Sequence, residues 1–259
     1  MELTALNNDT VKFCAKLKNK KFRDETGLFL LEGYKSVIEA IEYNIKLKYL
    51  FINKDKKNKY EGLLKIKDTS KNDIIETNEA VLKKISTTDT APDIVGIAYK
   101  PKQNKEILHK SKKVILLENI SDVGNLGTII RSAVAFNIDA IVLFGQSVDI
   151  YNPKCVRSTV GNLWKINILE MSTLAELERY FSDFERVATL PKNDNTVMFN
   201  DWTPAKKTFV MFGSEAHGLS KELINYSTQG VTIEMDNQVE SLNLSVSASI
   251  FMHKIGISG

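Results

Sequence analysis

Three short segments of the chain carry small and polar residues where a strand is predicted to end. They are DVGNLGTIIR (residues 122–131), FGSEAHGL (212–219) and IEMDNQVESLNLSVS (233–247). Each follows or contains an apolar, β-prone run, so three strand ends can meet at one edge of an α/β sheet, where such folds bind ligands. In the second segment, glycines allow close backbone approach, and Glu215 places a carboxylate at a strand end. The three segments together therefore predict one polar binding site.

Arg131 has two possible roles. It lies one turn into a predicted helix, TIIRSAVAFN, whose other residues are nearly all apolar. A charge on a mostly buried helix is usually paired, so a core carboxylate would explain it. A phosphate or a reactive group at the adjacent loop would explain it as well. The residues alone leave these two roles evenly balanced.

The first segment also has a purely structural explanation. Gly124 and Gly127 give only GxxG, without the full GxGxxG of a dinucleotide-binding turn. Side chains of Asp122 and Asn125 that bond neighbouring backbone amides would account for the same residues as a turn. Taken alone, this segment favours turn chemistry.

The other two segments are equally ambiguous when taken singly. Ser214 or Glu215 could simply cap the helix that follows. In SLNLSVSASIFM, Ser241 and Asn243 fit a cap and turn before a helix of small side chains, which allows tight packing against another backbone. That face could belong to a core, a dimer contact or a cofactor wall. Convergence of the three segments is what favours a functional site.

Length and composition predict two ordinary domains. The chain has 259 residues, of which 43% are hydrophobic and 26% charged, enough for two separate cores. No stretch approaches the roughly 20 apolar residues of a membrane span, and the start, MELTALNNDTVKF, lacks the apolar centre of a secretory signal. We therefore expect a cytoplasmic protein that has no membrane segment.

Cysteines and histidines indicate no metal site. Cys14 and Cys155 are far apart and belong to no CxxC or Cys/His ligand pattern, so we expect buried small hydrophobes rather than a disulfide or a zinc ligand. His109, His217 and His253 also lack ligand spacing. No metal is expected.

Positive charge gathers in the first part of the chain. Residues 1–110 hold 22 Lys and Arg against 16 Asp and Glu, whereas residues 111–259 hold 13 against 16. A phosphate-contacting face is predicted in KFCAKLKNKKFR, at Lys12, Lys16, Lys18, Lys20, Lys21 and Arg23. A second cluster is Lys54, Lys56, Lys57 and Lys59. Solvated lysines that keep the protein soluble are the alternative for either cluster alone.

The chain is predicted to divide near residue 100. Before it, short strands at FLLEG, KLKYLFI, NDIIET and DIVGIAY alternate with helical stretches such as YKSVIEAIEY, which predicts a small α/β domain over residues 1–100. A lysine-rich stretch at 101–111 suits a linker. Residues 112–259 form the second domain, with strands at VILLEN, AIVLF, KINIL, RVATL, TFVMF and GVTIEM. Its helices are expected around STLAELERYF, near SKELINY and from Leu244 onward.

Together, the three segments resemble the signature motifs of the SpoU (TrmH-like) RNA ribose methyltransferases, in the SPOUT superfamily. The first motif is matched by Asn119, Asp122, Asn125, Gly127 and Arg131, the second by Gly213, Glu215, Gly218 and Leu219, and the third by Ser241, Leu242, Asn243 and Ser245. FLLEGYKSVIEAI is similar to the start of the family's L30e-like domain, and residues 151–168 to the segment between the first two motifs. Val123, Ala216 and Glu234 depart from the usual residues, which leaves the shape of the cofactor loop open.

The resemblance implies an α/β fold in two parts. A smaller N-terminal L30e-like domain would bind the RNA substrate, and a C-terminal SPOUT methyltransferase domain would be tied in a deep trefoil knot, against the usual rule. S-adenosylmethionine would sit in the knot. Its predicted contacts are Gly213, Ile233, Leu242, Leu190, Pro191 and Met235. Family members form dimers through the knotted domain, so residues of two protomers would meet at each site.

The implied reaction methylates a ribose 2′-hydroxyl of structured RNA, with ribosomal RNA as the first expectation. Arg131 would activate the hydroxyl. Because a guanidinium stays protonated and is a poor base, orientation of the hydroxyl and stabilisation of the alkoxide are favoured over base catalysis. Asn125, Glu215, Ser241 and Asn243 would orient Arg131 and the ribose. The alternatives are tRNA as substrate, a non-catalytic RNA-binding member of the fold, and an oxidoreductase that uses GNLG for pyrophosphate. The last would leave the other two motifs unexplained.

Overall fold

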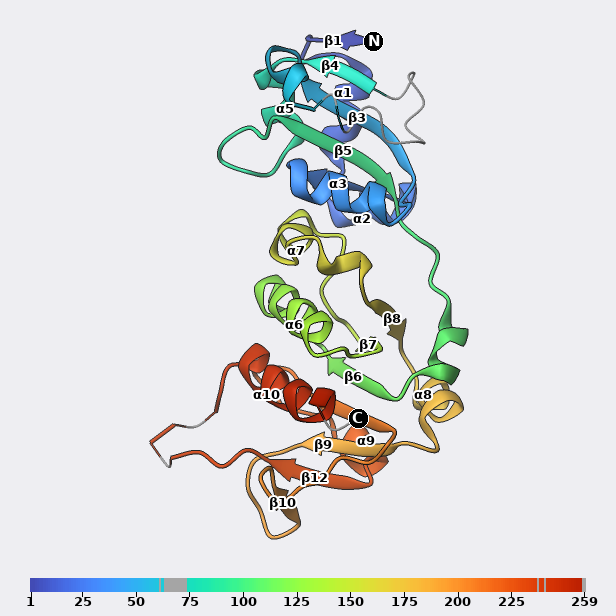
Figure 1. Cartoon of the computed structure of the whole chain (residues 1–259), viewed down its shortest axis with the longest axis vertical. Coiled ribbons are helices and arrows are strands. Elements are labelled where there is room, and N and C mark those ends of the chain that lie inside the picture. The colour runs from blue at the N-terminus through green and yellow to red at the C-terminus, as the bar shows by residue number, and fades with distance from the viewer. Residues whose placement is uncertain (61, 63–73, 237, 240, 258–259) are drawn as a thin grey trace. The chain divides into compact units, whose positions relative to one another are not determined.

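A computed structural model describes residues 1–60, 62, 74–236, 238–239 and 241–257 (Figure 1). The chain forms two compact units, and neither is continuous in sequence. The first comprises Met1–Lys102 and Asp149–Trp164, and the second comprises Gln103–Val148 and Lys165–Gly259. The chain therefore passes between the units three times.

The first unit is built on a five-stranded mixed sheet in the order β1-β4-β3-β5-β2. β5 is antiparallel to β2 and β3, whereas β4 is parallel to both β3 and β1. The strands are β1 (Glu2–Leu3), β2 (Leu28–Glu32), β3 (Leu47–Asn53), β4 (Ile74–Thr77) and β5 (Ile94–Tyr99). The helices are α1 (Asp9–Lys16), α2 (Lys20–Thr26), α3 (Tyr34–Glu42), α5 (Glu79–Ile85) and a 3₁₀ helix (Lys54–Tyr60). The four predicted strands are found, although residues 72–73 of NDIIET lie outside the described residues.

Apolar side chains of α1, α5 and the sheet form the core of this unit. Val11, Cys14 and Leu17 pack against Leu28 and Leu30, which alternate along β2 as a strand with one face on this layer requires. Cys14 is fully buried, and burial raises the pKa of its thiol to about 12. Cys155 is buried in the same way and also has a pKa of about 12. Both cysteines are therefore the inert core residues that the sequence predicts.

Residues 149–164, which we call the 149–164 segment, pack within the first unit. Tyr151 and Trp164 place their rings 4.9 and 5.7 Å from that of Phe29 on β2. The segment includes α7 (Pro153–Ser158) and a 3₁₀ helix (Asn162–Trp164). The sequence predicts a second domain that is continuous over residues 112–259, whereas residues 149–164 belong to the first unit. The structure differs because apolar rings and ion pairs, not sequence neighbours, decide where this segment packs.

The second unit contains a seven-stranded sheet whose neighbouring strands all run parallel, in the order β10-β12-β9-β11-β6-β7-β8. The strands are β6 (Lys113–Glu118), β7 (Ala140–Phe144), β8 (Asn167–Met171), β9 (Glu185–Thr189), β10 (Thr196–Met198), β11 (Thr208–Phe212) and β12 (Gln229–Thr232). The helices are α6 (Val123–Ala135), α8 (Leu174–Phe181), α9 (Lys221–Tyr226), α10 (Leu244–Ile257) and a 3₁₀ helix (Lys105–Lys110). β6 and β11 are buried along almost their whole length, as expected for central parallel strands.

Small residues let α10 approach α6 closely. The hydroxyl oxygens of Ser249 and Ser132 are 2.8 Å apart, and a Cβ on Gly256 would lie 2.4 Å from the carbonyl oxygen of Phe136. Phe251 on the other side of α10 packs against Phe212 of β11. Among the described residues, no helix is long and apolar enough to cross a membrane.

The GNLG sequence does not form the predicted loop. Asp122 is the N-cap of α6, and its carboxylate accepts a hydrogen bond from the backbone N–H of Asn125 at 2.7 Å. Because the cap stands at residue 122, Gly124 and Gly127 lie in the first turns of the helix. They are therefore not a phosphate-binding turn.

Candidate functional site

Four neighbouring strands end at one edge of the parallel sheet. β12, β9, β11 and β6 are adjacent, and their pairing keeps Val231 opposite Thr189 and Phe212 opposite Leu117. Because parallel strands have their carboxyl ends on the same side, the segments that follow residues 118, 189, 212 and 232 leave the sheet together. This confirms that the three sequence segments converge.

A chain of hydrogen bonds joins residues from all three segments. The Asn125 amide donates to Glu215 Oε1 at 2.7 Å, and the Asn243 amide donates to Asn125 Oδ1 at 3.1 Å. Asn243 Oδ1 in turn accepts from the backbone N–H and hydroxyl of Ser245, at 2.9 and 2.6 Å. These four residues are the polar cluster of the site. Both functional groups of Asn125 are engaged, so this residue links the other two segments.

The loop after β11 has almost no free space around Gly213. A Cβ at this position would lie 1.8 Å from the carbonyl carbon of Gly218, because the loop folds back and Gly218 N donates to Ser214 O at 2.9 Å. Gly218 itself has a φ of +65°, which favours glycine. Thus Gly213 is glycine because its own loop occupies the space. This is a different reason from the S-adenosylmethionine contact that the family resemblance implies.

A cavity of about 1140 Å³ opens beside this cluster. Asn125, Glu215 and Asn243 lie on its wall, together with main-chain and side-chain groups from the ends of β6, β7 and β11. The remaining lining residues are Glu118, Asn119, Ser121, Asp122, Gly145, Gln146, Ser214, Ala216, His217, Gly218, Leu219 and Ser220. His217 is exposed in the loop. The cavity is therefore large enough for a drug-sized molecule and has many polar groups.

Glu118 and Gln146 belong to the site but were not singled out from the sequence. Glu118 is 4% exposed, and its Oε2 accepts from the backbone N–H of Ser220, which caps α9. Gln146 donates its backbone N–H to the side-chain oxygen of Asn119, whose φ is +52°. Glu118 is the last residue of the buried strand β6. A carboxylate at that position is the feature of the sequence that could have indicated its place in the site.

Arg131 and Ser241 stand apart from the polar cluster. Arg131 is exposed, and the described residues offer it no ion pair, so the core-carboxylate explanation is wrong for this chain. It lies six positions after Asn125 on α6, about 240° further around the helix and on a different face. Ser241 is also exposed, just before α10.

The predicted cofactor residues lie at the same edge of the sheet. Leu190 follows β9, Ile233 follows β12, and both are half-buried, as is Leu242. Pro191 and Met235 are exposed. None of the six predicted cofactor residues is among those that line the cavity described above.

One predicted RNA contact is contradicted. Arg23 is only 1% exposed, and its Nε and Nη2 lie 2.8 and 2.7 Å from Oδ2 of Asp149. Its Nη1 donates to the carbonyl oxygens of Leu17 and Lys18. A guanidinium with its donors used inside the protein has no face to offer a phosphate. The predicted lysines Lys12, Lys16, Lys18, Lys20 and Lys21 are all exposed.

No group of three or more metal-ligating side chains exists among the described residues. The residues that line the cavity include amide, hydroxyl and carboxylate side chains, and Arg131 is not among them.

A parallel α/β sheet with a polar cluster at its carboxyl edge defines a ligand-binding α/β protein, and its architecture is that of known methyltransferases. An AdoMet-bound rRNA methyltransferase from Sinorhizobium meliloti superposes with a TM-score of 0.84 at 28% identity, over 98% of this chain and 96% of that one. Residues 112–253 match the SpoU rRNA Methylase family, and the chain belongs to this family. Residues 8–96 match the MRM3-like substrate binding domain.

Curated relatives extend over nearly the whole chain. The 23S rRNA (guanosine(2553)-2'-O)-methyltransferase of Bacillus subtilis is 25% identical over 254 residues, which are 98% of each chain. The mitochondrial rRNA methyltransferase 3 of Mus musculus is 26% identical, over 91% of this chain and 69% of the relative. The family predicted from the three motifs is thus confirmed.

Proposed function

We propose that this protein transfers the methyl group of S-adenosylmethionine to a ribose 2′-hydroxyl of ribosomal RNA. The observation that carries this proposal is the polar cluster, in which Asn125, Glu215 and Asn243 from three motifs form one hydrogen-bonded chain beside a cavity. Membership in the SpoU rRNA methylase family and relatives named as 23S rRNA 2'-O-methyltransferases support the substrate.

The residues at the sheet edge suit S-adenosylmethionine. Leu190, Ile233 and Leu242 are aliphatic and only half-buried, so their remaining surface is free to cover a flat adenine ring. The strand ends beside them supply backbone N–H and C=O groups for the polar edge of the base. When bound, S-adenosylmethionine supplies an activated methyl group on a sulfonium. The protein therefore mainly has to align the two reactants.

We assign the polar cluster to positioning and Arg131 to the reacting hydroxyl. Glu215 holds the Asn125 amide, and Asn125 holds Asn243, so each amide keeps a fixed orientation toward the cavity. A guanidinium is a poor base but a strong donor, so Arg131 stabilises the developing alkoxide of the ribose. Ser241 is exposed beside α10 and is available to the ribose.

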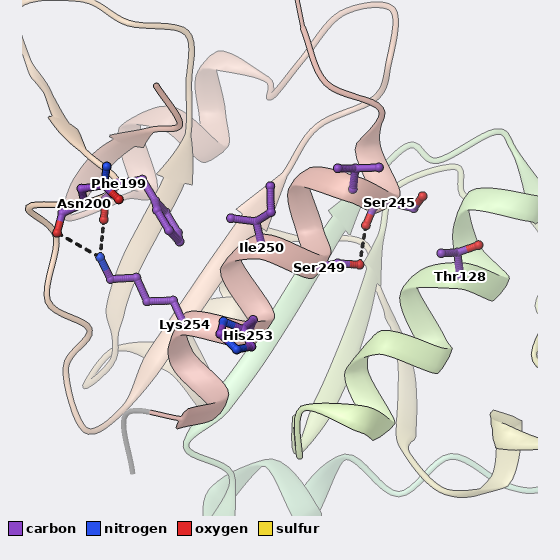
Figure 2. A pocket seen from close by; sticks show the side chains of 9 residues that line it. Thr128, Phe199, Asn200, Ser245, Ser249, Ile250, His253 and Lys254 are labelled. Carbon is purple, nitrogen blue, oxygen red and sulfur yellow. Dashed lines mark hydrogen bonds between the residues drawn. The ribbon is translucent and has the colours of Figure 1, made fainter. Parts of the chain in front are cut away.

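We infer that two copies of the chain complete one site. A groove of about 600 Å³ runs along α10. Figure 2 shows Thr128 of α6 on one side of this helix and Phe199 and Asn200 on the other. Val246 lies in this groove and is 47% exposed. A second copy seated there would cover Val246. Because Arg131 lies one turn beyond Thr128 on the exposed side of α6, a dimer would carry it to the partner's site.

We also propose that the second unit contains the trefoil knot that the family resemblance implies. Tight passage of a helix through a loop needs small side chains, and α10 presents Ser245, Ser249 and Gly256 with such contacts. The cytoplasmic location stays a prediction.

The test of function uses the full chain, radiolabelled S-adenosylmethionine, and ribosomal RNA or tRNA from cells that lack the protein. We expect label in ribosomal RNA as one 2′-O-methylated nucleotide, and labelling at least about 10²-fold slower with Arg131→Ala. Label confined to tRNA would favour the alternative substrate. No transfer to any RNA, despite cofactor binding, would support a non-catalytic member of the fold.

A mixing experiment tests the shared site. Arg131→Ala and Asn125→Ala are each expected to be inactive, and both keep the groove of Figure 2 intact. If Arg131 acts at the partner's site, an equal mixture of the two, exchanged into mixed dimers, recovers about one quarter of wild-type activity. If Arg131 acts within its own protomer, the mixture stays inactive. A monomer by light scattering would refute the dimer directly.

A further inference from the structure

Two sets of lysines in the first unit differ in their contacts. Lys12, Lys20 and Lys21 each pair with a carboxylate three or four residues away, at 3.3, 3.4 and 3.9 Å. The lysines of the second cluster, Lys54, Lys56, Lys57 and Lys59, also form ion pairs, and two of them share Asp93. These exposed pairs add little stability, but they place a carboxylate beside each lysine. Seven lysines of the two lysine-rich sequences therefore already have a carboxylate partner.

Three other lysines lie over aromatic rings instead. Lys16 Nζ is 5.8 Å from the ring centroid of Phe22, and Lys46 Nζ is 5.3 Å from that of Tyr99. Lys48 Nζ is 5.7 Å from the rings of both Phe13 and Tyr49. Within the part of the chain that is described, none of these three lysines has a carboxylate partner. We call these seven residues the lysine–aromatic surface.

This surface is continuous within the first unit. The rings of Phe13 on α1 and Phe22 on α2 meet edge-on, with centroids 5.2 Å apart. Lys48 joins Phe13 to Tyr49 at the start of β3, and the backbone N–H of Tyr99 donates to the carbonyl of Lys46, just before that strand. Two helices and two strands therefore contribute to one face.

The rings are held in place yet accessible. Phe13, Phe22 and Tyr49 are half-buried and pack against the core of the unit, and Tyr99 is 37% exposed. Positive charge extends past Lys16 to Lys18, where partial burial and repulsion from Lys83 lower the pKa of the Lys18 ammonium. Fixed rings lose little entropy on stacking, and lysines without local partners attract phosphate without first breaking an ion pair.

We propose that the lysine–aromatic surface binds unpaired nucleotides of the RNA substrate, with its lysines on phosphates and its rings, Tyr99 foremost, against bases. The inference rests on the proposed function, because it names the form of RNA that the enzyme would recognise. Base faces are available in single strands and loops but hidden in a duplex. A double helix could use only the lysines.

Two triple variants with equal charge change test the lysines. One combines Lys16→Gln, Lys46→Gln and Lys48→Gln, and the matched control combines Lys12→Gln, Lys20→Gln and Lys21→Gln. Binding of the full chain to a fluorescent single-stranded RNA of about 20 nucleotides is measured by anisotropy at several salt concentrations. We expect at least tenfold weaker binding for the first triple, with a salt slope reduced by about 2, because each single-strand phosphate contact contributes about 0.7. The control should change binding less than threefold. Equal effects of both triples would overturn the proposal.

Tyr99→Ala tests stacking separately. It should weaken single-strand binding about tenfold while leaving a duplex of the same sequence unaffected, because only the single strand offers base faces. Circular dichroism confirms that each variant is folded. If Tyr99→Ala binds both RNAs as wild type does, the rings have no role and the proposal fails.

The test of the lysine–aromatic surface can fail or succeed independently of the test of methyl transfer. Methyl transfer to ribosomal RNA by the wild-type protein is measured in parallel. If the first triple loses binding but the wild type transfers no methyl group, the surface stands and the enzymatic proposal fails. If the wild type methylates RNA and both triples bind alike, the function stands and the surface does not.

Discussion

Arg23 on α2 and Arg131 on α6 occupy opposite environments in the two units. Arg23 is almost fully buried, and its guanidinium bonds Asp149 and two backbone carbonyls. Arg131 is exposed, on a helix whose other faces pack into the second unit. One arginine completes a core, and the other is available for a substrate. Local sequence suggests the reverse, since Arg23 stands among lysines and Arg131 among apolar residues.

The difference shows that the partner decides an arginine's role. The partner of Arg23 is 126 positions away, where no local pattern would indicate it. Asp149 is itself 8% exposed in its side chain, so the two charges desolvate each other and must stay together. Arg131 meets no such carboxylate among the described residues, so its charge stays available.

The largest effect is expected from Arg23→Ala. Removing one partner of a buried pair leaves Asp149 uncompensated and should lower the free energy of unfolding by about 3–5 kcal/mol. Urea unfolding followed by tryptophan fluorescence, with Trp164 as reporter in the same unit, measures this. Lys20→Ala is the matched control and should stay within about 0.5 kcal/mol, because its pair with Asp24 is exposed. An unchanged stability for Arg23→Ala with lost RNA binding would restore the phosphate-contact role.

Arg131→Ala should do the opposite. We expect single-turnover methylation about 10²–10³-fold slower, the usual effect of removing a donor to a developing oxyanion. Stability should change by less than about 0.5 kcal/mol, because the side chain is exposed. Arg131→Lys keeps the charge but loses the planar fork, so it should be badly impaired too. A protein destabilised by about 3–5 kcal/mol with normal single-turnover rate would contradict the assignment.

Gly213 and Gly218 lie in one loop but differ in the space that a Cβ would find, so their alanine variants should differ in stability. Gly213→Ala forces a Cβ against the carbonyl carbon of Gly218, so it should cost about 1–3 kcal/mol and displace Glu215 from Asn125. Gly218→Ala meets nothing within 4 Å and should cost only the strain of its positive φ, about 1 kcal/mol. Thermal unfolding and cofactor titration check both variants. Equal losses would show that crowding at Gly213 is relieved elsewhere.

The smallest effect is expected at Glu215. Glu215→Gln keeps an oxygen that accepts from Asn125, whereas Glu215→Ala leaves that amide without its acceptor. Replacing a charged acceptor by a neutral one should cost about 1 kcal/mol of transition-state stabilisation, a several-fold slower reaction, with a larger loss for alanine. Single-turnover rates at saturating cofactor compare the two. Equal rates for glutamine and alanine would mean that the hydrogen bond does not orient Asn125 during the reaction.

The polar cluster could be predicted because strand ends position it. Asn125, Glu215 and Asn243 are short side chains at fixed points after buried strands, and a parallel sheet brings those points together. The start of the last helix at Leu244 could also be predicted, because a polar cap precedes a run of small residues there. The burial of Arg23 and the packing of the 149–164 segment were not predictable, because contacts over more than a hundred positions determine both. Lys12, Lys20 and Lys21 pair with carboxylates on their own helices, which a charge count over residues 1–110 does not reveal.

The interrupted arrangement of the first unit sets an order for its folding during synthesis. The ring of Phe29 is not covered until Tyr151 and Trp164 have been synthesised, and Arg23 has no ion-pair partner until Asp149 has been synthesised. At about 5–20 residues per second, ribosomes deliver the 149–164 segment some seconds after residue 102 has emerged. During that interval the nascent chain carries an unpaired guanidinium and an uncovered ring on β2.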